Sequence, residues 1–199
     1  MLVEKKIFYH IHSQNEFSVH WKVGNTLIFS KNKLNCFSDF YETKFSPQLT
    51  INQEKVPFNK GFGEINISNI VNNIDDTEYL LTKSRCILKE MGIYLRETIY
   101  EEVRQEKFAH LPSRKHCIWM CDEKSLDYWI SRLRHDSQVF EVLFTGNIHR
   151  GSDEYLEADI LPIKVLREKA LKYWEGNIGI SNNDEVIGEG SVEIIRQLK

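Results

Sequence analysis

The chain has 199 residues, of which 41% are hydrophobic and 28% charged, so wholesale disorder is excluded. The 26 Lys and Arg residues against 29 Asp and Glu give a formal net charge of -3, which excludes a global basic field for nonspecific nucleic-acid binding. No apolar run reaches the roughly 18 residues of a membrane span, and the first residues lack the apolar core of a signal peptide. We therefore expect a soluble, cytoplasmic protein that forms a single domain over residues 1–199.

The first third of the chain predicts few regular elements. Residues 4–11 are aromatic and β-branched and predict a strand, and residues 14–24 predict a short helix that ends at Gly24. Residues 26–73 are polar, rich in Asn and aromatic side chains, and irregular in pattern. Because a structureless loop of that length is unusual in a compact domain, we expect this segment to contain short strands or helical turns.

The clearest element is a long amphipathic helix over Asp75–Lys107. Polar residues that can cap its start are followed by apolar residues at three- and four-residue spacing. Leu111-Pro112 follows the predicted end, as is typical of a terminated helix. The spacing predicts that the helix packs on a sheet through one apolar face, formed by Leu81, Leu88, Met91, Leu95 and Val103.

The rest of the chain predicts shorter elements. In order, these are a strand over 116–121, a helix over 124–134, a strand over 138–146, a polar turn over 147–153, a helix over 162–174, a loop over 176–184 and a strand over 185–195. Strands lie towards both ends with helices between them, and no βαβ unit repeats. The pattern therefore predicts the α+β class.

The cysteines allow two interpretations. Cys117 and Cys121 are four residues apart, with His110 and His116 upstream, and this grouping is compatible with half of a zinc site. However, no second Cys/His pair lies at a suitable spacing, and free Cys is among the most buried residue types. We expect two buried apolar thiols and no metal, and rank a zinc protein last among the functional alternatives.

Three groups of residues can carry chemistry. On the first strand, alternation places His10 and His12 on one face and Tyr9 on the other, where they can bind a ligand, a metal or a phosphate or remain solvated. Residues 111–116 contain cations, a hydroxyl and imidazoles, which suit an anionic ligand or an ordinary solvated connection. Carboxylates at 184–189 can stabilise a developing positive charge, act as a base, or lie solvated at a strand edge.

Taken in order, these groups resemble the motifs of the ADP-ribosyltransferase fold. Tyr9-His10 resembles its first motif, including the opening of the DNA-targeting toxin branch, Pro112-Ser113-Arg114 its second, and the stretch that contains Glu185 its third. The chain also resembles an uncharacterised bacterial domain family of that fold over roughly residues 78–195. The matching residues are Arg96-Glu97, Glu101-Glu102-Val103-Arg104, Leu111-Pro112-Ser113-Arg114, Cys117, Trp119, Tyr173-Trp174, Gly176, Glu189-Gly190 and Val192.

The resemblance implies a split β-sheet core with NAD as co-substrate and ADP-ribose transferred to an unknown acceptor, protein or nucleic acid. It assigns the catalytic carboxylate to Glu185 or, alternatively, Glu189. The residues that it implies for NAD binding are Tyr9, His10, His12, Ser113 and Arg114, with His10 on the adenosine ribose and Arg114 on the pyrophosphate.

These implied roles predict that His10, Ser113 and Glu185 face one cleft. The alternative from a different functional class is a catalytically inactive module on the same fold. Such a module would present residues 110–116 and 26–73 to a nucleotide, a nucleic acid or a protein.

Overall fold

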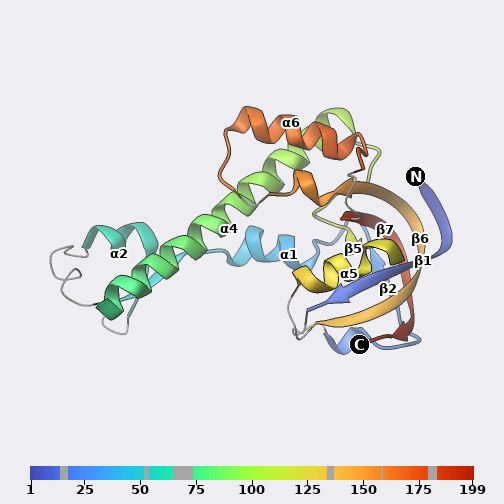
Figure 1. The fold of residues 1–199 in the computed structure, drawn as a ribbon, viewed down its shortest axis with the longest axis horizontal. Coiled ribbons are helices and arrows are strands. Elements are labelled where there is room, and N and C mark those ends of the chain that lie inside the picture. Colours follow the sequence, from blue (N-terminus) through green and yellow to red (C-terminus); the bar gives the residue numbers. More distant parts are fainter. Residues whose placement is uncertain (14–17, 52–53, 65–73, 134–136, 158, 179–182) are drawn as a thin grey trace.

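The computed structural model describes residues 1–13, 18–51, 54–64, 74–133, 137–157, 159–178 and 183–199. Its helices and antiparallel strands confirm the α+β class, and Figure 1 shows a curled sheet with the long helix α4 running past it. The strands are β1 (Leu2–His12), β2 (Thr26–Phe29), β3 (Gln48–Ile51), β4 (Glu54–Pro57), β5 (Ile118–Met120), β6 (Gln138–Ser152) and β7 (Asp184–Gln197). The α-helices are α1 (Cys36–Asp39), α2 (Phe58–Glu64), α4 (Ile74–Lys107), α5 (Glu123–Arg132) and α6 (Ile163–Trp174).

The main sheet closes on itself. Its strand order is β1-β6-β7-β2, and β5 pairs with β7 on the same edge as β2. Beyond β5, Cys121 and Tyr9 exchange two backbone hydrogen bonds of 2.9 Å, so the β5 side of the sheet meets β1. The result is a small antiparallel barrel in which β6 and β7 pair over most of their length (Figure 1).

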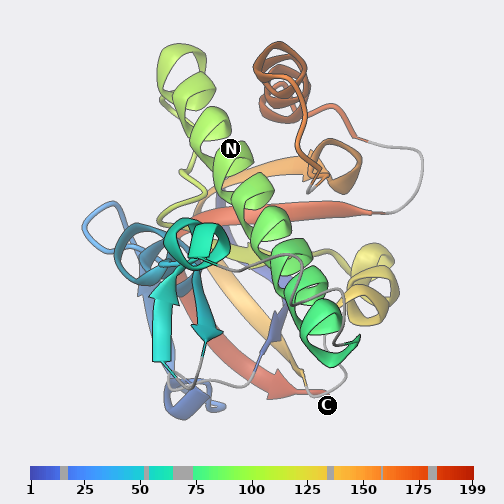
Figure 2. The same ribbon diagram turned by 90° about the vertical axis from the view of Figure 1, so that its left-hand side faces the viewer.

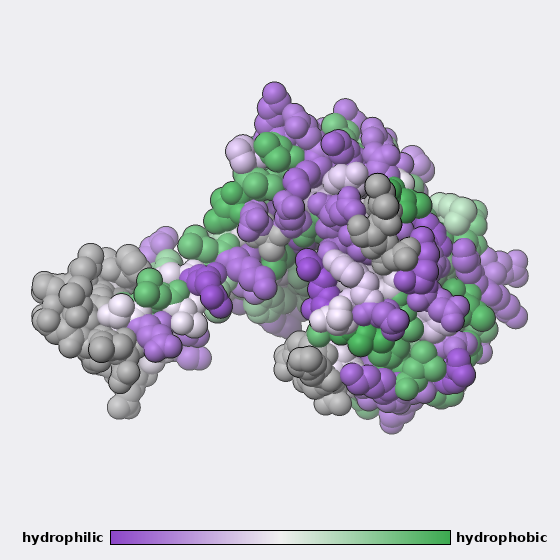
Figure 3. Space-filling model, viewed as in Figure 1, coloured by the Kyte–Doolittle hydropathy of each residue, from purple (hydrophilic) through white to green (hydrophobic). Residues whose placement is uncertain are grey.

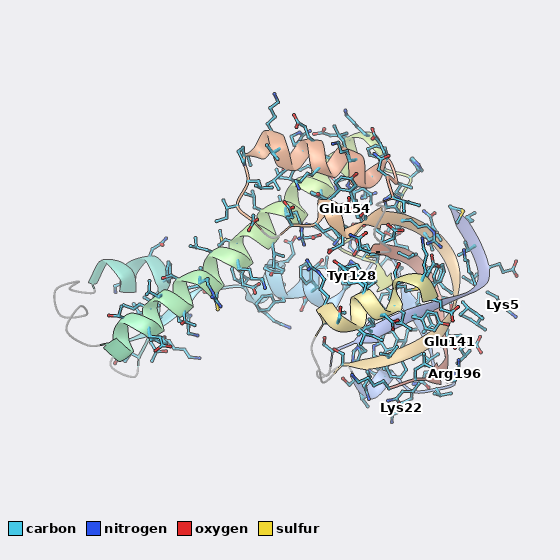
Figure 4. The ribbon with its side chains drawn as sticks, in the orientation of Figure 1. Lys5, Lys22, Tyr128, Glu141, Glu154 and Arg196 are labelled. Atoms are coloured by element: carbon cyan, nitrogen blue, oxygen red, sulfur yellow. The ribbon has the colours of Figure 1, made fainter. Side chains whose placement is uncertain are left out.

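Strand alternation gives the barrel wall an inner and an outer face. On β7, Val186, Val192 and Ile194 point inwards and pack with Phe8 and the other buried residues of the interior. Ile187 points outwards into a second core, formed with residues of α4 and α6 that include Tyr100, Val103, Leu166, Tyr173 and Trp174. Figure 4 shows Glu141 of β6 and Arg196 of β7 close together at one end of the wall, where they form an ion pair.

The long helix has almost the predicted bounds, but its predicted face is wrong along its first half. Val103 is buried, and Leu95 packs against the second core. By contrast, Leu81, Leu88 and Met91 are 67%, 55% and 43% exposed. The reason is that this half of α4 projects from the body, beyond the reach of the main sheet and α6 (Figures 1 and 3).

Two other sequence predictions are corrected. The predicted polar turn over 147–153 is mostly strand, because Ile148 is buried inside the barrel and His149 packs outside it against Tyr173. The predicted helix over 14–24 is a single 3₁₀ turn, Ser18–His20, among its described residues, and residues 14–17 lie outside the described part.

The predicted irregular segment contains short elements, as expected. Its described part holds β2, α1, a π-helical turn (Phe40–Lys44), β3, β4 and α2, whereas residues 52–53 and 65–73 lie outside the description. So do residues 179–182 of the predicted loop over 176–184. Within the described ranges, no helix combines the length and apolar character needed to cross a bilayer.

Candidate active site

The candidate site is a cavity of about 320 Å³ on the barrel wall beside β5. His10 of β1 and Glu185 of β7 both line it, although they lie near opposite ends of the chain. The remaining walls come from β1, β5, α1 and α5 and are mostly aromatic or apolar. The other lining residues are Tyr9, Ile11, Ser13, Phe37, Trp119, Met120, Cys121, Trp129 and Leu133. No Lys or Arg is among these lining residues.

His10 is one of the residues that line the cavity. Its Nδ1 lies 2.8 Å from the backbone oxygen of Trp119, and because a carbonyl only accepts, Nδ1 carries the hydrogen. The ring stacks on Trp21 at 4.0 Å. Burial lowers the pKa of His10 to about 4, so the imidazole is neutral at pH 7 and its Nε2 is an acceptor. This Nε2 is buried and has no hydrogen-bond partner among the described residues.

Tyr9 and His12 occupy different positions around the site. Tyr9 lines the cavity from the outer face of β1. His12 lies on the face of His10, as alternation predicts, and stacks on the same Trp21 at 5.1 Å. Its Nε2 is 2.9 Å from the hydroxyl of Ser18, and burial lowers its pKa. His12 therefore supports Trp21 and is not one of the cavity's lining residues.

Glu185 is held by two donors on one oxygen. Arg114 and the hydroxyl of Tyr173, the latter at 2.6 Å, both donate to its Oε1. The contact with Tyr173 depends on Gly151 of β6, since a Cβ at that position would lie 2.2 Å from the tyrosine ring. No described residue donates to Oε2 of Glu185, which leaves this oxygen for a ligand.

Arg114 is the centre of a buried ionic network. Its Nη1 donates to Tyr173 at 2.7 Å and to Glu185, and its Nε donates to Glu97 of α4 at 2.8 Å. Burial opposes the charge of Arg114, but Glu185 and Glu97 together raise its pKa. Burial likewise opposes ionisation of Glu97, but Arg114 and then Arg96 lower its pKa to about 2. Arg114 and Glu97 are therefore both charged at pH 7.

The network corrects the position inferred for Arg114. The resemblance implied that the Arg114 guanidinium is open to a pyrophosphate. In the structure Arg114 is 6% exposed, and its Nε, Nη1 and Nη2 all donate to protein oxygens. Arg114 therefore positions Glu185.

Ser113 and Glu189 join α4 to β7 beside the cavity. The Ser113 hydroxyl donates to Glu101 at 2.9 Å, and its backbone N–H donates to Glu189 at 2.7 Å. Glu101 also receives two bonds from Arg104. Neither Ser113 nor Glu189 lines the cavity. The predicted cleft thus contains His10 and Glu185 but not Ser113, whose side chain is directed to α4.

The network joins residues that the sequence pattern had grouped without explanation. Arg96-Glu97, Glu101, Arg104 and Tyr173 carried the resemblance quoted above, and the structure connects them to Ser113 and Arg114. Sequence reasoning gave no role to Glu97 or Tyr173, although their motif was the available signal. It missed Phe37 and Trp129 as well, for which aromatic composition was the only indication.

The two central cysteines are buried next to this network. The Cys117 thiol donates to the backbone oxygen of Arg114 at 3.4 Å, and burial raises its pKa. Burial also raises the pKa of Cys121, to about 12. Across the described ranges, no group of three or more His, Cys, Asp and Glu side chains is arranged to hold a metal ion. The absence of a metal stays a prediction.

Comparison with known proteins places the chain in a family. No curated protein matches it. A family model described as "Protein of unknown function (DUF2441)" matches residues 8–199, which includes every residue of the cavity and of the ionic network. Because the match spans nearly the whole sequence, the chain belongs to the DUF2441 family.

Proposed function

We propose that the cavity binds the nicotinamide end of NAD and that the protein transfers ADP-ribose to an acceptor, on an ADP-ribosyltransferase-like core. The observation that carries the proposal is that Glu185 and His10 line one aromatic cavity and that no described residue donates to Oε2 of Glu185. The resemblance of the sequence motifs to that fold supports it independently.

The chemistry of the walls suits this ligand. The nicotinamide ring of NAD is a flat cation, and aromatic faces and a carboxylate attract such a group. Tyr9, Phe37, Trp119 and Trp129 supply the faces and Glu185 the charge. Because no cation is among the lining residues, the pyrophosphate of NAD would lie outside this cavity.

Transfer would break the bond between ribose C1′ and the nicotinamide nitrogen. The bond's electron pair leaves with nicotinamide, and positive charge grows on the ribose, as in glycoside cleavage. Glu185 stabilises that charge through its free Oε2 while Arg114 and Tyr173 hold Oε1 in place. An acceptor nucleophile then bonds to C1′ and loses its proton.

A second candidate is a binding module without catalysis, which one observation favours. Arg114 forms an ion pair with Glu185, with side-chain exposures of 6% and 7%, and so compensates part of the negative charge that the transfer would need. In this case NAD or a related nucleotide would bind and remain intact.

The test is nicotinamide release from NAD by the purified protein, with NAD binding measured in parallel. Glu185→Gln should reduce release by about 10²–10³-fold, the usual effect of removing one transition-state interaction, and leave binding within a few-fold. Glu189→Gln is the matched control, because it makes the same change on the same strand outside the cavity.

Three outcomes would contradict the proposal. Loss of activity in Glu189→Gln but not in Glu185→Gln would reassign the catalytic carboxylate. NAD binding without nicotinamide release would favour the binding module. Failure to bind NAD at millimolar concentration would exclude both the transferase and the NAD-binding module.

A further inference from the structure

The projecting half of α4 carries an apolar stripe that none of the described residues covers. Leu81, Leu88 and Met91 are large, exposed and spaced by seven and three residues, which places them on one side of the helix. Their exposure falls from 67% to 43% towards the body, where the same side continues into Leu95. Figure 3 shows green and purple residues side by side on the visible face of this projecting part.

The covered half of α4 shows what the stripe is suited to. There α6 packs on the helix, with an apolar contact around Leu166 and an ion pair from Arg167 to Glu106 beside it. α6 begins at Ile163, so the stripe beyond it has no such partner. The other side of this half of α4 faces residues 36–51 and 54–64, where the backbone N–H of Thr50 donates to the hydroxyl of Tyr79 at 3.0 Å.

The two neighbours of α4 therefore leave the stripe open. In Figure 2, α2 and α6 lie on opposite sides of α4. The spacing of these side chains normally indicates a buried helix face, but here that face of α4 is exposed to solvent. A helix with a matching apolar face could cover it, as α6 covers the other half of α4.

We propose that the stripe binds a second copy of this chain, with the two α4 helices antiparallel and Leu81 of each packed against Leu88 of the other. The flanking charges favour a second copy over an unrelated helix. Glu78 and Lys89 lie on one flank of the stripe, are exposed, and form no ion pair among the described residues. In the antiparallel arrangement each Glu78 meets the partner copy's Lys89.

One two-fold axis satisfies both sets of contacts. The midpoint of Leu81 and Leu88 and the midpoint of Glu78 and Lys89 fall within about one residue of each other along the helix, next to Ser84. The small Ser84 side chain permits close approach of the two helices at the axis. Arg85 lies beside the axis, so the dimer brings two like charges together there, and this contact opposes association.

The test is sedimentation velocity of the full chain from about 1 to several hundred micromolar. The proposal predicts a concentration-dependent monomer–dimer equilibrium that Leu88→Glu abolishes. Ile28→Glu, at an exposed apolar position on β2, is the matched control and should leave the equilibrium unchanged. Circular dichroism of each variant shows that the fold is retained.

The charge variants test the register. Glu78→Lys or Lys89→Glu alone should weaken the dimer by roughly two- to tenfold, the range for two exposed ion pairs, and the double variant should restore it. Arg85→Gln should strengthen the dimer. A chain that stays monomeric throughout, or a dimer that Leu88→Glu does not affect, would overturn the proposal. A double charge variant no stronger than the single ones would overturn the register.

Discussion

At the scale of single residues, Arg114 is the group on which most of the site depends. Its neighbours Glu97 and Glu185 are both largely buried, and its removal takes the cationic partner of Glu185 and one of the two cationic partners of Glu97. Alternation along one strand was enough to predict that His10 and His12 share a face. It could not predict that the donors of Arg114 would be occupied, because Glu97 and Tyr173 come from helices whose packing no local pattern specifies.

Arg114→Ala should lower the free energy of unfolding by about 3–5 kcal/mol, because it leaves the buried Glu185 without a counter-charge and Glu97 with Arg96 alone. Urea denaturation measures the loss. Arg167→Ala is the comparison, since Arg167 pairs with Glu102 and Glu106 at the surface of α6 and its removal should cost no more than about 1 kcal/mol. Similar losses in the two variants would show that the network is not the buried unit described here.

The buried histidines predict a pH dependence of stability. Burial lowers the pKa of His149 from 6.5 to about 4, so the unfolded chain binds a proton at this position more readily than the folded one. The contribution of His149 is therefore fully present above pH 6.5 and is lost as the pH falls towards 4, by about 3 kcal/mol in all.

The check is urea denaturation between pH 7 and pH 4.5 for the wild type and His149→Gln. The variant should lose less stability than the wild type over this range, while His10, with a similar shift, keeps part of the dependence in both. Parallel curves would mean that His149 titrates alike in the folded and unfolded chains.

At the scale of elements, the sequence predicts the bounds of α4 well and its environment poorly. Periodicity shows which residues share a side of a helix but not what covers that side. Ile99 lies on the same side of α4 as Leu88, yet α6 and the barrel cover Ile99, whereas no described residue covers Leu88. The length of β6 was underestimated for a related reason, because the polar His149 is buried against Tyr173 and Trp174 of α6 and is not solvated.

Ile99→Ala should therefore destabilise the fold by about 2–5 kcal/mol, the usual loss for a buried aliphatic side chain. Leu88→Ala should change the unfolding free energy of the monomer by no more than about 0.5 kcal/mol, since its side chain is largely solvated. Chemical denaturation at low micromolar concentration, where association is weakest, separates the two. Equal losses would place Leu88 in an intramolecular core.

At the scale of the whole molecule, the site exists because the barrel closes. Tyr9 and Cys121 bring β1 to β5, and that contact places His10 next to the strand pair that carries Glu185. The sequence motifs predicted His10 and Glu185 as partners. The closing contact, and the walls added by Phe37 and Trp129, depend on long-range pairing that spacing along the chain does not encode.

The most direct test of the NAD site is isothermal titration calorimetry with NAD. His10→Ala should weaken NAD binding at least tenfold relative to the wild type, because His10 is one of the residues that line the cavity. His149→Gln, which changes an equally buried imidazole outside this cavity, should leave the affinity within about twofold. Absence of binding by the wild type at millimolar NAD, or equal losses in the two variants, would contradict the assignment of this cavity to NAD.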